Sequence, residues 1–476
     1  MLLAPDQGFS SRYLLRTDIY RTLRESGAHL VILSPHAREP YFIQEFSGEN
    51  VSLEHYDLDA GLAYLRSSRL HRHLQLLRDM TAKQTADLAT FEARRKREVA
   101  RGEWRHQVID SARRMPVWLL RRSRLLRRSL VALESMLFAP RLYEHLFRKY
   151  RPDLLVVTSV GNFRGPDVLL MREARRHACK VASVVLSWDN SSSRGIGGAA
   201  PDFVVAWTPT MKQELVEYQD LTSSQIFVGG VAHWDRYYGR ESRTRDELFR
   251  HFGLDPDKRL LLFATAAPTG YAELNIETVH ILGRAIADHA LVSDCQVLVR
   301  LHPNYFSRMR EAVARETLPQ IEEAAAAYPA VRLTRPKLNS RGVSFDFAGD
   351  DASDLQDLLR HCDVLITTFS TVMLEACIFD KPVVNVAFAR YSHRMGQPYT
   401  AVTNYAHLKR ILAAGGTRTA TTPAEVLECI NGYLLQPGMD RDGRTRIRER
   451  ECGPYPGTAG RRIGEHLLQL VASVPN

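Results

Sequence analysis

One stretch of the chain, DVLITTFSTVMLEACIFDKPVVN (residues 363–385), constrains the fold more than any other. It begins with the apolar run 364–368, which has the length and composition of a buried strand. The polar pair Ser370 and Thr371 comes next, followed by an apolar segment with helical periodicity and, after Pro382, by a second apolar run. The order strand, polar turn, helix, strand predicts a parallel sheet covered by helices.

The polar turn in this stretch is a candidate anion site. The N-terminus of a helix that follows a parallel strand lies at the carboxyl edge of the sheet, and its free N–H groups favour anions. Ser370 and Thr371 are therefore candidates to cap the helix and to hydrogen-bond a phosphate, and Glu375 to accept bonds from a ribose diol. A capped helix without any ligand gives the same pattern, so both interpretations remain open.

Short apolar runs of the same kind recur on both sides of the charged segment 236–258. The pattern predicts an α/β protein with two doubly wound, Rossmann-like domains that face each other across a cleft. We expect residues 1–238 to form the N-terminal domain, 239–456 the C-terminal domain, and 457–476 a C-terminal helix. The other runs lie at 1–5, 29–34, 153–160, 181–188, 203–207, 226–231, 260–264, 296–301 and 331–334.

Polar residues that follow the apolar runs are candidates for catalysis, because loops at the carboxyl ends of parallel strands often carry chemistry. In the N-terminal half, Asp189 in the loop SWDN (187–190) is the leading candidate for a catalytic base. The alternative is an Asx turn that closes the strand. His233, in the loop after the run 226–231, is a second candidate, chosen on position alone.

In the C-terminal half, a candidate site follows the run QVLVRL (296–301). Pro303 ends the strand and holds His302 at its carboxyl edge. Arg300 should point to the same face as His302, where it would either bind a phosphate or pair with an internal carboxylate. Thr265, which begins the loop after a neighbouring apolar run, is a further candidate for binding the same phosphate-bearing ligand.

The net charge of +10 is concentrated in one segment. Residues 94–128 hold 13 Lys and Arg against 3 Asp and Glu, which accounts for the whole excess. Because this charge is local and lies in a helical insertion (about 62–148), we expect no nucleic-acid binding. Residues 113–138 interleave leucines and Trp118 with paired arginines. Three alternatives stay open for this segment: leucines packed inside with solvated arginines, a surface for peripheral binding to an anionic membrane, or a surface for a partner protein.

Other features exclude several classes of protein. Six cysteines without a CxxC pair predict reduced core residues and no zinc site. No window approaches the roughly 20 apolar residues that span a bilayer, and no secretory signal begins the chain. We therefore expect a cytoplasmic protein without an integral membrane segment, a metal site or a cofactor other than its substrate.

Two motifs resemble those of a known family. LVRLHPN (298–304) and DVLITTFSTVMLEACIFDKPVV (363–384) are similar to the HP motif and the paired Ser/Thr motif of GT-B fold glycosyltransferases. The most similar branch contains the bacterial CDP-glycerol glycerophosphotransferases and the CMP-sugar transferases of surface-polysaccharide biosynthesis. The resemblance covers most of residues 150–470 and leaves out the basic helical insertion.

The resemblance implies roles for the candidate residues. His302 would contact the donor phosphate, Ser370 and Thr371 would bind the same diphosphate, and Glu375 would bind the ribose. Asp6 in the first loop becomes a third candidate base, because related folds often bind the acceptor there.

The function implied by the resemblance is that of a glycosyltransferase. It would move a sugar or a polyol phosphate from a nucleotide-activated donor to a glycan or polyprenyl-linked acceptor, without a metal ion and on the inner face of the cell membrane. Two alternatives share the architecture. One is a sugar-nucleotide 2-epimerase, which needs no acceptor, and the other is a non-catalytic scaffold of a glycan-assembly complex.

Overall fold

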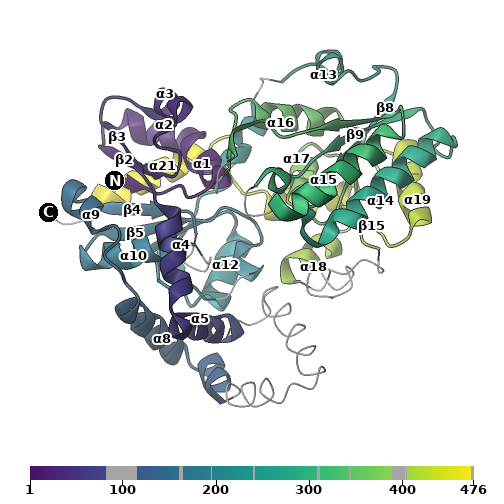
Figure 1. Ribbon diagram of the computed structural model, residues 1–476. Helices are drawn as coiled ribbons and strands as arrows, with labels where there is room; N and C mark the ends of the chain where they lie inside the picture. Colours follow the sequence, from purple (N-terminus) through teal and green to yellow (C-terminus); the bar gives the residue numbers. More distant parts are fainter. Residues whose placement is uncertain are drawn as a thin grey trace. The chain divides into compact units, whose positions relative to one another are not determined.

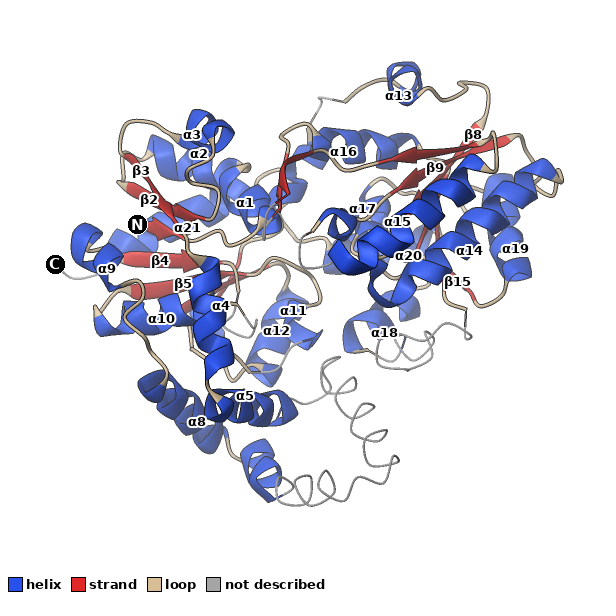
Figure 2. Ribbon diagram, viewed as in Figure 1, coloured by secondary structure: helices blue, strands red, loops and turns tan. Residues whose placement is uncertain are grey.

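The computed structural model divides the chain into two compact units. Unit 1 comprises Met1–Asp235 and Gly453–Asn476, and unit 2 comprises Arg236–Cys452. Each unit has its own parallel sheet covered by helices (Figures 1 and 2). The structure describes residues 1–81, 115–159, 165–193, 196–239, 242–307, 311–341, 345–388, 403 and 405–472.

The sheet of unit 1 has seven parallel strands in the order β3-β2-β1-β4-β5-β6-β7. The chain therefore winds outward in one direction from β1 to β3 and in the other from β4 to β7. The point where the direction reverses lies between β1 and β4, and open α/β sheets bind their ligands at such a point. The strands are β1 (Leu2–Leu3), β2 (Leu30–Ser34), β3 (Val51–His55), β4 (Leu154–Val157), β5 (Lys180–Val184), β6 (Phe203–Ala206) and β7 (Ile226–Val228).

The first helix of unit 1, α1, begins at Gly8, two residues after Asp6. The described α-helices of this unit are α1 (Gly8–Leu15), α2 (Asp18–Glu25), α3 (Pro40–Phe46), α4 (Leu58–Ser67), α5 (Arg69–Thr81), α8 (Arg124–Leu137), α9 (Glu144–Tyr150), α10 (Asp167–Arg176), α11 (Asn190–Ser193), α12 (Pro209–Tyr218) and α21 (Ala459–Ala472).

The C-terminal helix α21 belongs to unit 1, where it packs against α2 (Figure 1). Two glycines one turn apart allow the close approach. A Cβ atom at Gly464 would lie 2.7 Å from the Cβ of Thr22, and one at Gly460 would lie 3.0 Å from the Cβ of Asp18. Larger residues at either position would force the two helices apart.

The sheet of unit 2 has six parallel strands in the order β10-β9-β8-β13-β14-β15, so its direction reverses between β8 and β13. The strands are β8 (Arg259–Ala264), β9 (Cys295–Arg300), β10 (Val331–Thr334), β13 (Val364–Thr367), β14 (Val383–Val386) and β15 (Arg418–Ala420), beside a hairpin of β11 (Leu338–Arg341) and β12 (Phe345–Phe347). The helices are α13 (Arg245–Phe252), α14 (Pro268–Ala287), α15 (Glu311–Ala326), α16 (Asp351–His361), α17 (Val372–Ile378), α18 (Ala406–Ala413), α19 (Pro423–Leu435) and α20 (Arg441–Glu451).

The central strands of both sheets are apolar because helices cover both of their faces. Every residue of β4 and β13 is buried, as are all six cysteines, which carry no disulfide. The predicted α/β class with two doubly wound sheets is therefore confirmed. In the described part of the chain, no helix combines the length and the apolar character needed to cross a bilayer.

A buried ionic cluster joins the described part of the helical insertion to the sheet of unit 1. Glu134 on α8 accepts hydrogen bonds from Arg78 on α5 (2.6 Å) and from Arg172 on α10 (2.7 Å). Burial alone would raise the pKa of Glu134, but contacts with His71 and the two arginines outweigh it and lower this pKa to about 2. A buried carboxylate without such partners would strongly destabilise the fold, so this cluster fixes α8 against the sheet.

Candidate functional site

Three neighbouring strands of unit 2 end together at the point where the strand order reverses. His302 follows β9, Thr265 follows β8, and the turn 368–371 follows β13. The backbone N–H of His302 donates to Oγ1 of Thr265 (2.9 Å), and Oγ1 of Thr367 donates to the carbonyl oxygen of Ala264 (3.1 Å). The stretch 363–385 and His302 therefore lie at one carboxyl edge of the sheet.

His302 is held as a neutral hydrogen-bond donor. Its Nδ1 accepts from the backbone N–H of Asn304 (3.0 Å), so the ring proton is on Nε2. Burial lowers the pKa of His302 to about 4, which keeps the ring uncharged at neutral pH. Nε2 has no hydrogen-bond partner among the described residues, so its N–H can be donated to a ligand.

The turn after β13 has an unusual backbone. Phe369 adopts the left-handed conformation with φ of 54°, and its N–H donates to Oδ1 of Asn385 on β14 (3.1 Å). Such a conformation costs free energy in a residue other than glycine and is often found at functional sites. Thr371 occupies the N-cap position of α17, but the expected side-chain cap is not formed. The Ser370 hydroxyl has no hydrogen-bond partner within the described ranges.

Glu375 is more enclosed than the sequence suggested. The residue is only 7% exposed, and its Oε2 accepts a hydrogen bond from the hydroxyl of Tyr237. The Tyr237 ring packs against Phe379 at 5.2 Å between ring centroids. Tyr237 was missed by the sequence reasoning, because nothing in its local pattern connects it to a helix more than 130 residues later.

Arg300 has an internal partner. Its Nη2 lies 2.7 Å from Oδ1 of Asp351, and both side chains are almost fully buried. The same carboxylate oxygen accepts from the N–H of Lys337 (2.8 Å). Of the two alternatives for Arg300, the structure thus has the internal ion pair, and we give Arg300 a structural role in place of phosphate binding.

A second residue that the sequence reasoning missed supports the loop after β8. The Asn275 side chain is fully buried and makes two hydrogen bonds of 3.0 Å with the backbone of Ala266. It also donates to the hydroxyl of Tyr305 (3.1 Å), in the 3-10 turn that follows His302. One side chain therefore fixes two of the loops that form this edge.

Unit 1 has a different set of side chains where its strand order reverses. Asp6 follows β1, and Asp167 begins α10 after β4. Oδ1 of Asp6 accepts from the Ser10 hydroxyl (2.8 Å) and from the Thr158 hydroxyl (3.4 Å). Burial, together with the charge of Asp167, raises the pKa of Asp6 to about 7. Burial also raises the pKa of Asp167.

The other two candidate bases of unit 1 do not join this pair. Asp189 follows β5, where its Oδ1 accepts from the Ser187 hydroxyl (2.5 Å). His233 follows β7 and packs among the rings of Tyr13 (5.0 Å) and Trp207 (5.7 Å). Burial and then the charge of Arg12 lower its pKa well below the usual value.

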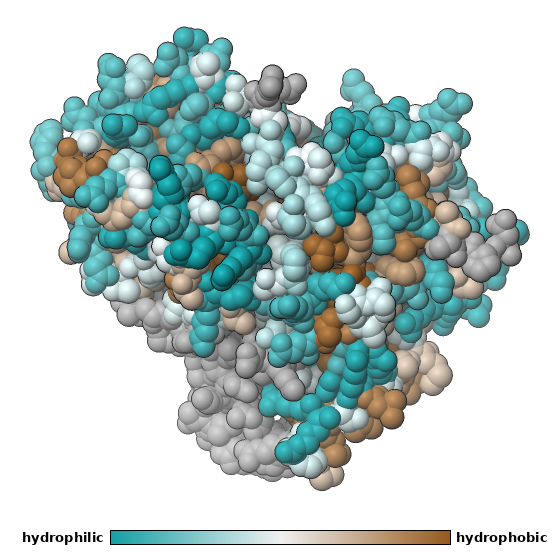
Figure 3. Space-filling model, turned by 180° about the vertical axis from the view of Figure 1, so that it is seen from behind, coloured by the Kyte–Doolittle hydropathy of each residue, from teal (hydrophilic) through white to brown (hydrophobic). Residues whose placement is uncertain are grey.

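Many apolar side chains of the basic segment face outward, although Val117, Val131 and Phe138 are buried. On α8, Leu125 is 74% exposed and Met136 is 71% exposed, and the neighbouring 115–122 helix exposes Trp118. Figure 3 shows hydrophobic side chains at the surface on the side where α8 lies. The whole exposed set is Met115, Trp118, Leu119, Leu125, Leu126, Leu133, Met136 and Leu137. Residues 113 and 114 of the predicted segment lie outside the described ranges.

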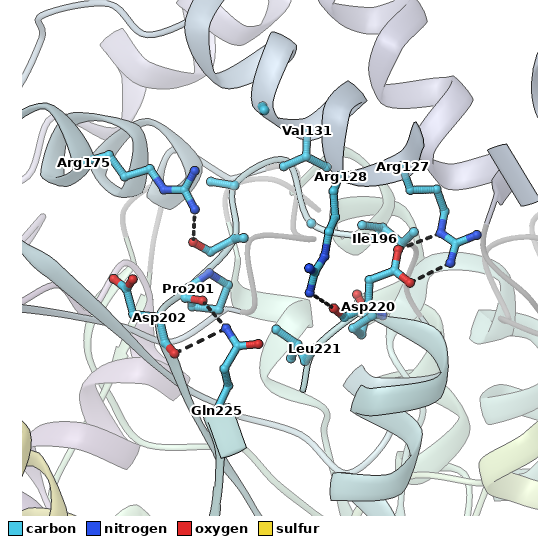
Figure 4. A pocket seen from close by; sticks show the side chains of 15 residues that line it. Arg127, Arg128, Val131, Arg175, Ile196, Pro201, Asp202, Asp220, Leu221 and Gln225 are labelled. Carbon is cyan, nitrogen blue, oxygen red and sulfur yellow. Dashed lines mark hydrogen bonds and ion pairs between the residues drawn. The ribbon is translucent and has the colours of Figure 1, made fainter. Parts of the chain in front are cut away.

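Three arginines of α8, Arg124, Arg127 and Arg128, bind the body of unit 1. Arg127 forms a bidentate ion pair with Asp220, with both N–O distances at 2.6 Å, and Arg128 donates to the Asp220 carbonyl (Figure 4). These residues line a cavity of about 320 Å³ between α8 and the amino ends of β6 and β7. The cavity is thus at the sheet edge opposite Asp6, and Arg175 and Asp202 also line it.

The comparisons with known proteins identify the family. Residues 199–465 match the profile of CDP-Glycerol:Poly(glycerophosphate) glycerophosphotransferase, which is more than half of the chain. The chain belongs to this family. It is therefore related to transferases that use a nucleotide-activated donor, and the resemblance inferred from the two motifs is confirmed. The match includes the unit 2 edge with His302 and Ser370 but excludes Asp6 and α8.

Solved structures confirm the GT-B-like fold. An S. aureus MnaA–UDP co-structure matches with a TM-score of 0.53 at 12% identity, over 100% of this chain and 98% of that one. A putative UDP-N-acetylglucosamine 2-epimerase from Listeria monocytogenes gives 0.54 at 11% identity, with coverage of 100% and 97%. A glycosyltransferase from Rickettsia africae gives 0.51 at 11% identity, with coverage of 100% and 98%. None of the curated proteins matches the sequence.

Proposed function

We propose that the protein transfers a polyol phosphate, in the first instance glycerol phosphate, from a CDP-linked donor to an acceptor hydroxyl in surface-polymer synthesis. The observation that carries this proposal is the pairing of His302 with the Ser370–Thr371 turn at one sheet edge inside the region that matches the family. A sugar as the transferred group remains the alternative within the same fold.

The chemistry needs donors that stabilise a leaving nucleotide. The acceptor oxygen attacks the phosphorus next to the glycerol, the bond from that phosphorus to the bridging oxygen breaks, and CMP leaves with the electron pair. Positioning and electrostatic stabilisation supply most of the rate enhancement in such transfers. The Nε2–H of His302 and the hydroxyls of Ser370 and Thr371 would hydrogen-bond the diphosphate, and Glu375 would bind the ribose.

Calorimetric titration tests the donor site. We expect cytidine nucleotides, including CDP-glycerol, to bind the wild type, and His302→Ala to lose about 10- to 100-fold in affinity, since a hydrogen bond to a charged group contributes about 1.5–3 kcal/mol. His251→Ala on α13 is the matched control, because that ring is 41% exposed and its Nε2 lies 3.7 Å from Asp354 on α16, away from the strand ends. If no nucleotide binds, or if both variants bind like the wild type, the donor site is wrong.

Product analysis separates the remaining functions. CMP release from CDP-glycerol that requires an acceptor supports the proposal. Epimerisation of a UDP-sugar without any acceptor would identify a 2-epimerase. A protein that binds no nucleotide but binds other enzymes of glycan assembly would be a scaffold.

We also propose that the exposed face of α8 and of the helix 115–122 binds an anionic membrane. A helix face of leucine, methionine and tryptophan beside arginines is typical of peripheral membrane proteins. Arg122, which lies over the Trp118 ring at 3.9 Å, is suited to the headgroup level of a bilayer. This surface would hold unit 1 beside a lipid-linked acceptor.

A further inference from the structure

Two carboxyl groups of unit 1 face the same space. A Cβ atom at Gly165 would lie 3.3 Å from Oδ1 of Asp167 and 3.9 Å from Oδ2 of Asp6. Asp167 is 2% exposed, and its Oδ1 has no hydrogen-bond partner in the described part of the chain. A buried carboxylate oxygen without a partner is costly, so its presence calls for an explanation.

The local hydrogen bonds of Asp6 explain only part of this arrangement. The hydroxyls of Ser10 and Thr158 bond Oδ1 of Asp6, which leaves Oδ2 directed toward the side of Asp167. The charge that acts most strongly on Asp6 is that of Asp167, and no cation offsets it among the described residues. Asparagine at either position would serve a purely structural role with less destabilisation.

We propose that Asp6 and Asp167 act as a carboxyl pair in which Asp6 is the general base that takes the proton of the acceptor hydroxyl. Asp167 is a positioning residue: its carboxyl group makes Asp6 more basic without contacting the substrate. This inference rests on the proposed function, because it assigns a role in that transfer. When the acceptor oxygen bonds to phosphorus and CMP leaves, the acceptor proton moves to Oδ2 of Asp6, from which water later removes it.

The position of the pair supports this role over the other candidates. It lies where the strand order of unit 1 reverses, between β1 and β4, the position at which open α/β sheets bind substrates. A base is most effective when its pKa is near the working pH, and burial together with Asp167 moves Asp6 into that range. Asp189 and His233 show no comparable pairing.

Among the described residues, the titratable groups of other elements that interact with the pair are phenols. Tyr56, after β3, and Tyr143, before α9, both interact with Asp167, and burial raises the pKa of each above the usual value. Both remain neutral between pH 5 and 8. The two phenols therefore do not contribute to the pH dependence of activity or stability in that range. A dependence that is lost on substitution of Asp6 or Asp167 reports on the carboxyl pair.

Kinetics of the full-length protein test the base. We expect Asp6→Asn to lower kcat by roughly 10²- to 10⁴-fold while donor binding stays unchanged by calorimetry. Asp167→Asn should keep substantial activity but shift the acidic limb of the pH–rate profile to lower pH by about one unit, because Asp6 loses the like charge beside it. Asp59→Asn, an exposed carboxylate on α4, is the matched control and should change neither. An Asp6→Asn variant with near-normal kcat, or an Asp167→Asn profile identical to the wild type, would overturn the proposal.

Unfolding experiments test the pair without reference to activity. A carboxyl group with a raised pKa stabilises the fold at low pH and loses that contribution as pH rises through the folded-state pKa. The Tm of the wild type should therefore fall between about pH 4 and pH 7 relative to both Asn variants. Parallel Tm curves would contradict the pair. The Tm curves can also diverge while the wild type consumes no donor. In that case the proposed function and the assignment of Asp6 as base are both wrong, and only the coupling of the two carboxyl groups is supported.

Discussion

The two sheets share the same order for their first six strands, to which unit 1 adds a seventh, but they carry different side chains at equivalent positions. In unit 1 the strand order reverses between β1 and β4, and in unit 2 it reverses between β8 and β13. The position in unit 2 holds neutral donors, namely the imidazole of His302 and the hydroxyl of Ser370. The position in unit 1 holds two carboxyl groups, Asp6 and Asp167. The fold thus supplies two equivalent edges, and the side chains decide what each can bind.

This difference separates the two substrates. A nucleoside diphosphate carries several negative charges and would be repelled by Asp6 and Asp167, whereas uncharged N–H and O–H groups can hydrogen-bond it. An acceptor hydroxyl is neutral and must lose a proton, for which a carboxylate pair is suited. Donor binding therefore fits unit 2 and acceptor activation fits unit 1. Arg300 and Glu375, the two charged residues among the donor-site candidates of unit 2, have internal partners.

The largest effect should come from giving the unit 2 edge the chemistry of unit 1. His302→Asp removes a donor and adds a like charge beside the diphosphate, so we expect a loss of roughly 10³-fold in CDP-glycerol affinity by calorimetry, about 4 kcal/mol. His302→Gln retains an N–H donor and should lose much less. Equal affinities for the two variants would mean that charge at this edge does not distinguish the two units.

A second prediction concerns the proposed membrane surface, which lies on unit 1. Replacing Leu125 and Met136 together by Glu should reduce binding to anionic liposomes by roughly 100-fold in a flotation assay, since each side chain contributes about 1.5 kcal/mol when buried in lipid. Leu435→Glu on α19 of unit 2 is the control, because Leu435 is equally exposed but belongs to no such face. If all proteins float equally, α8 is not the membrane surface.

The pH dependence of stability should differ in sign between the two edges. His302 has a pKa of about 4 in the folded protein against about 6.5 unfolded, so the unfolded state binds more protons and stability falls as pH drops from 6.5 toward 4. The loss should reach about 3 kcal/mol and disappear in His302→Gln, as measured by urea unfolding. The Asp6–Asp167 pair acts oppositely, with stability falling as pH rises. A His302→Gln curve parallel to the wild type would show that His302 is not buried neutral.

The sequence could predict both sheet edges but only some of the residues on them. His302 was found because Pro303 ends a strand, and Ser370 because a polar pair separates a strand from a helix; both are local signals. Asp167 and Tyr237 were missed because their importance depends on contacts with Asp6 and Glu375, which are more than 130 residues away along the chain. Periodicity cannot report such contacts.

The outward face of α8 illustrates the same limit. The spacing of leucines predicts one apolar side, but which side faces water depends on what the arginines bind. Asp220 and the neighbouring carbonyl groups accept from Arg124, Arg127 and Arg128, and with these arginines bound Leu125 and Met136 face outward. Asp220 lies on a loop between α12 and β7, so the sequence of α8 alone could not identify it as the partner.

The smallest predicted effect concerns the bond that orients the proposed ribose ligand. Tyr237→Phe removes the hydroxyl that donates to Glu375 and leaves the ring packed against Phe379, so the fold should be retained. If Glu375 binds the ribose, its carboxylate becomes less well oriented, and affinity for CMP should fall by about 1 kcal/mol, or roughly fivefold, by calorimetry. Glycerol 2-phosphate, which lacks a nucleoside, should bind both proteins equally weakly and serves as the control ligand. A fivefold loss for CMP alone would place the ribose at Glu375, whereas unchanged CMP affinity would leave Glu375 as a structural carboxylate and confine donor recognition to His302 and the turn after β13.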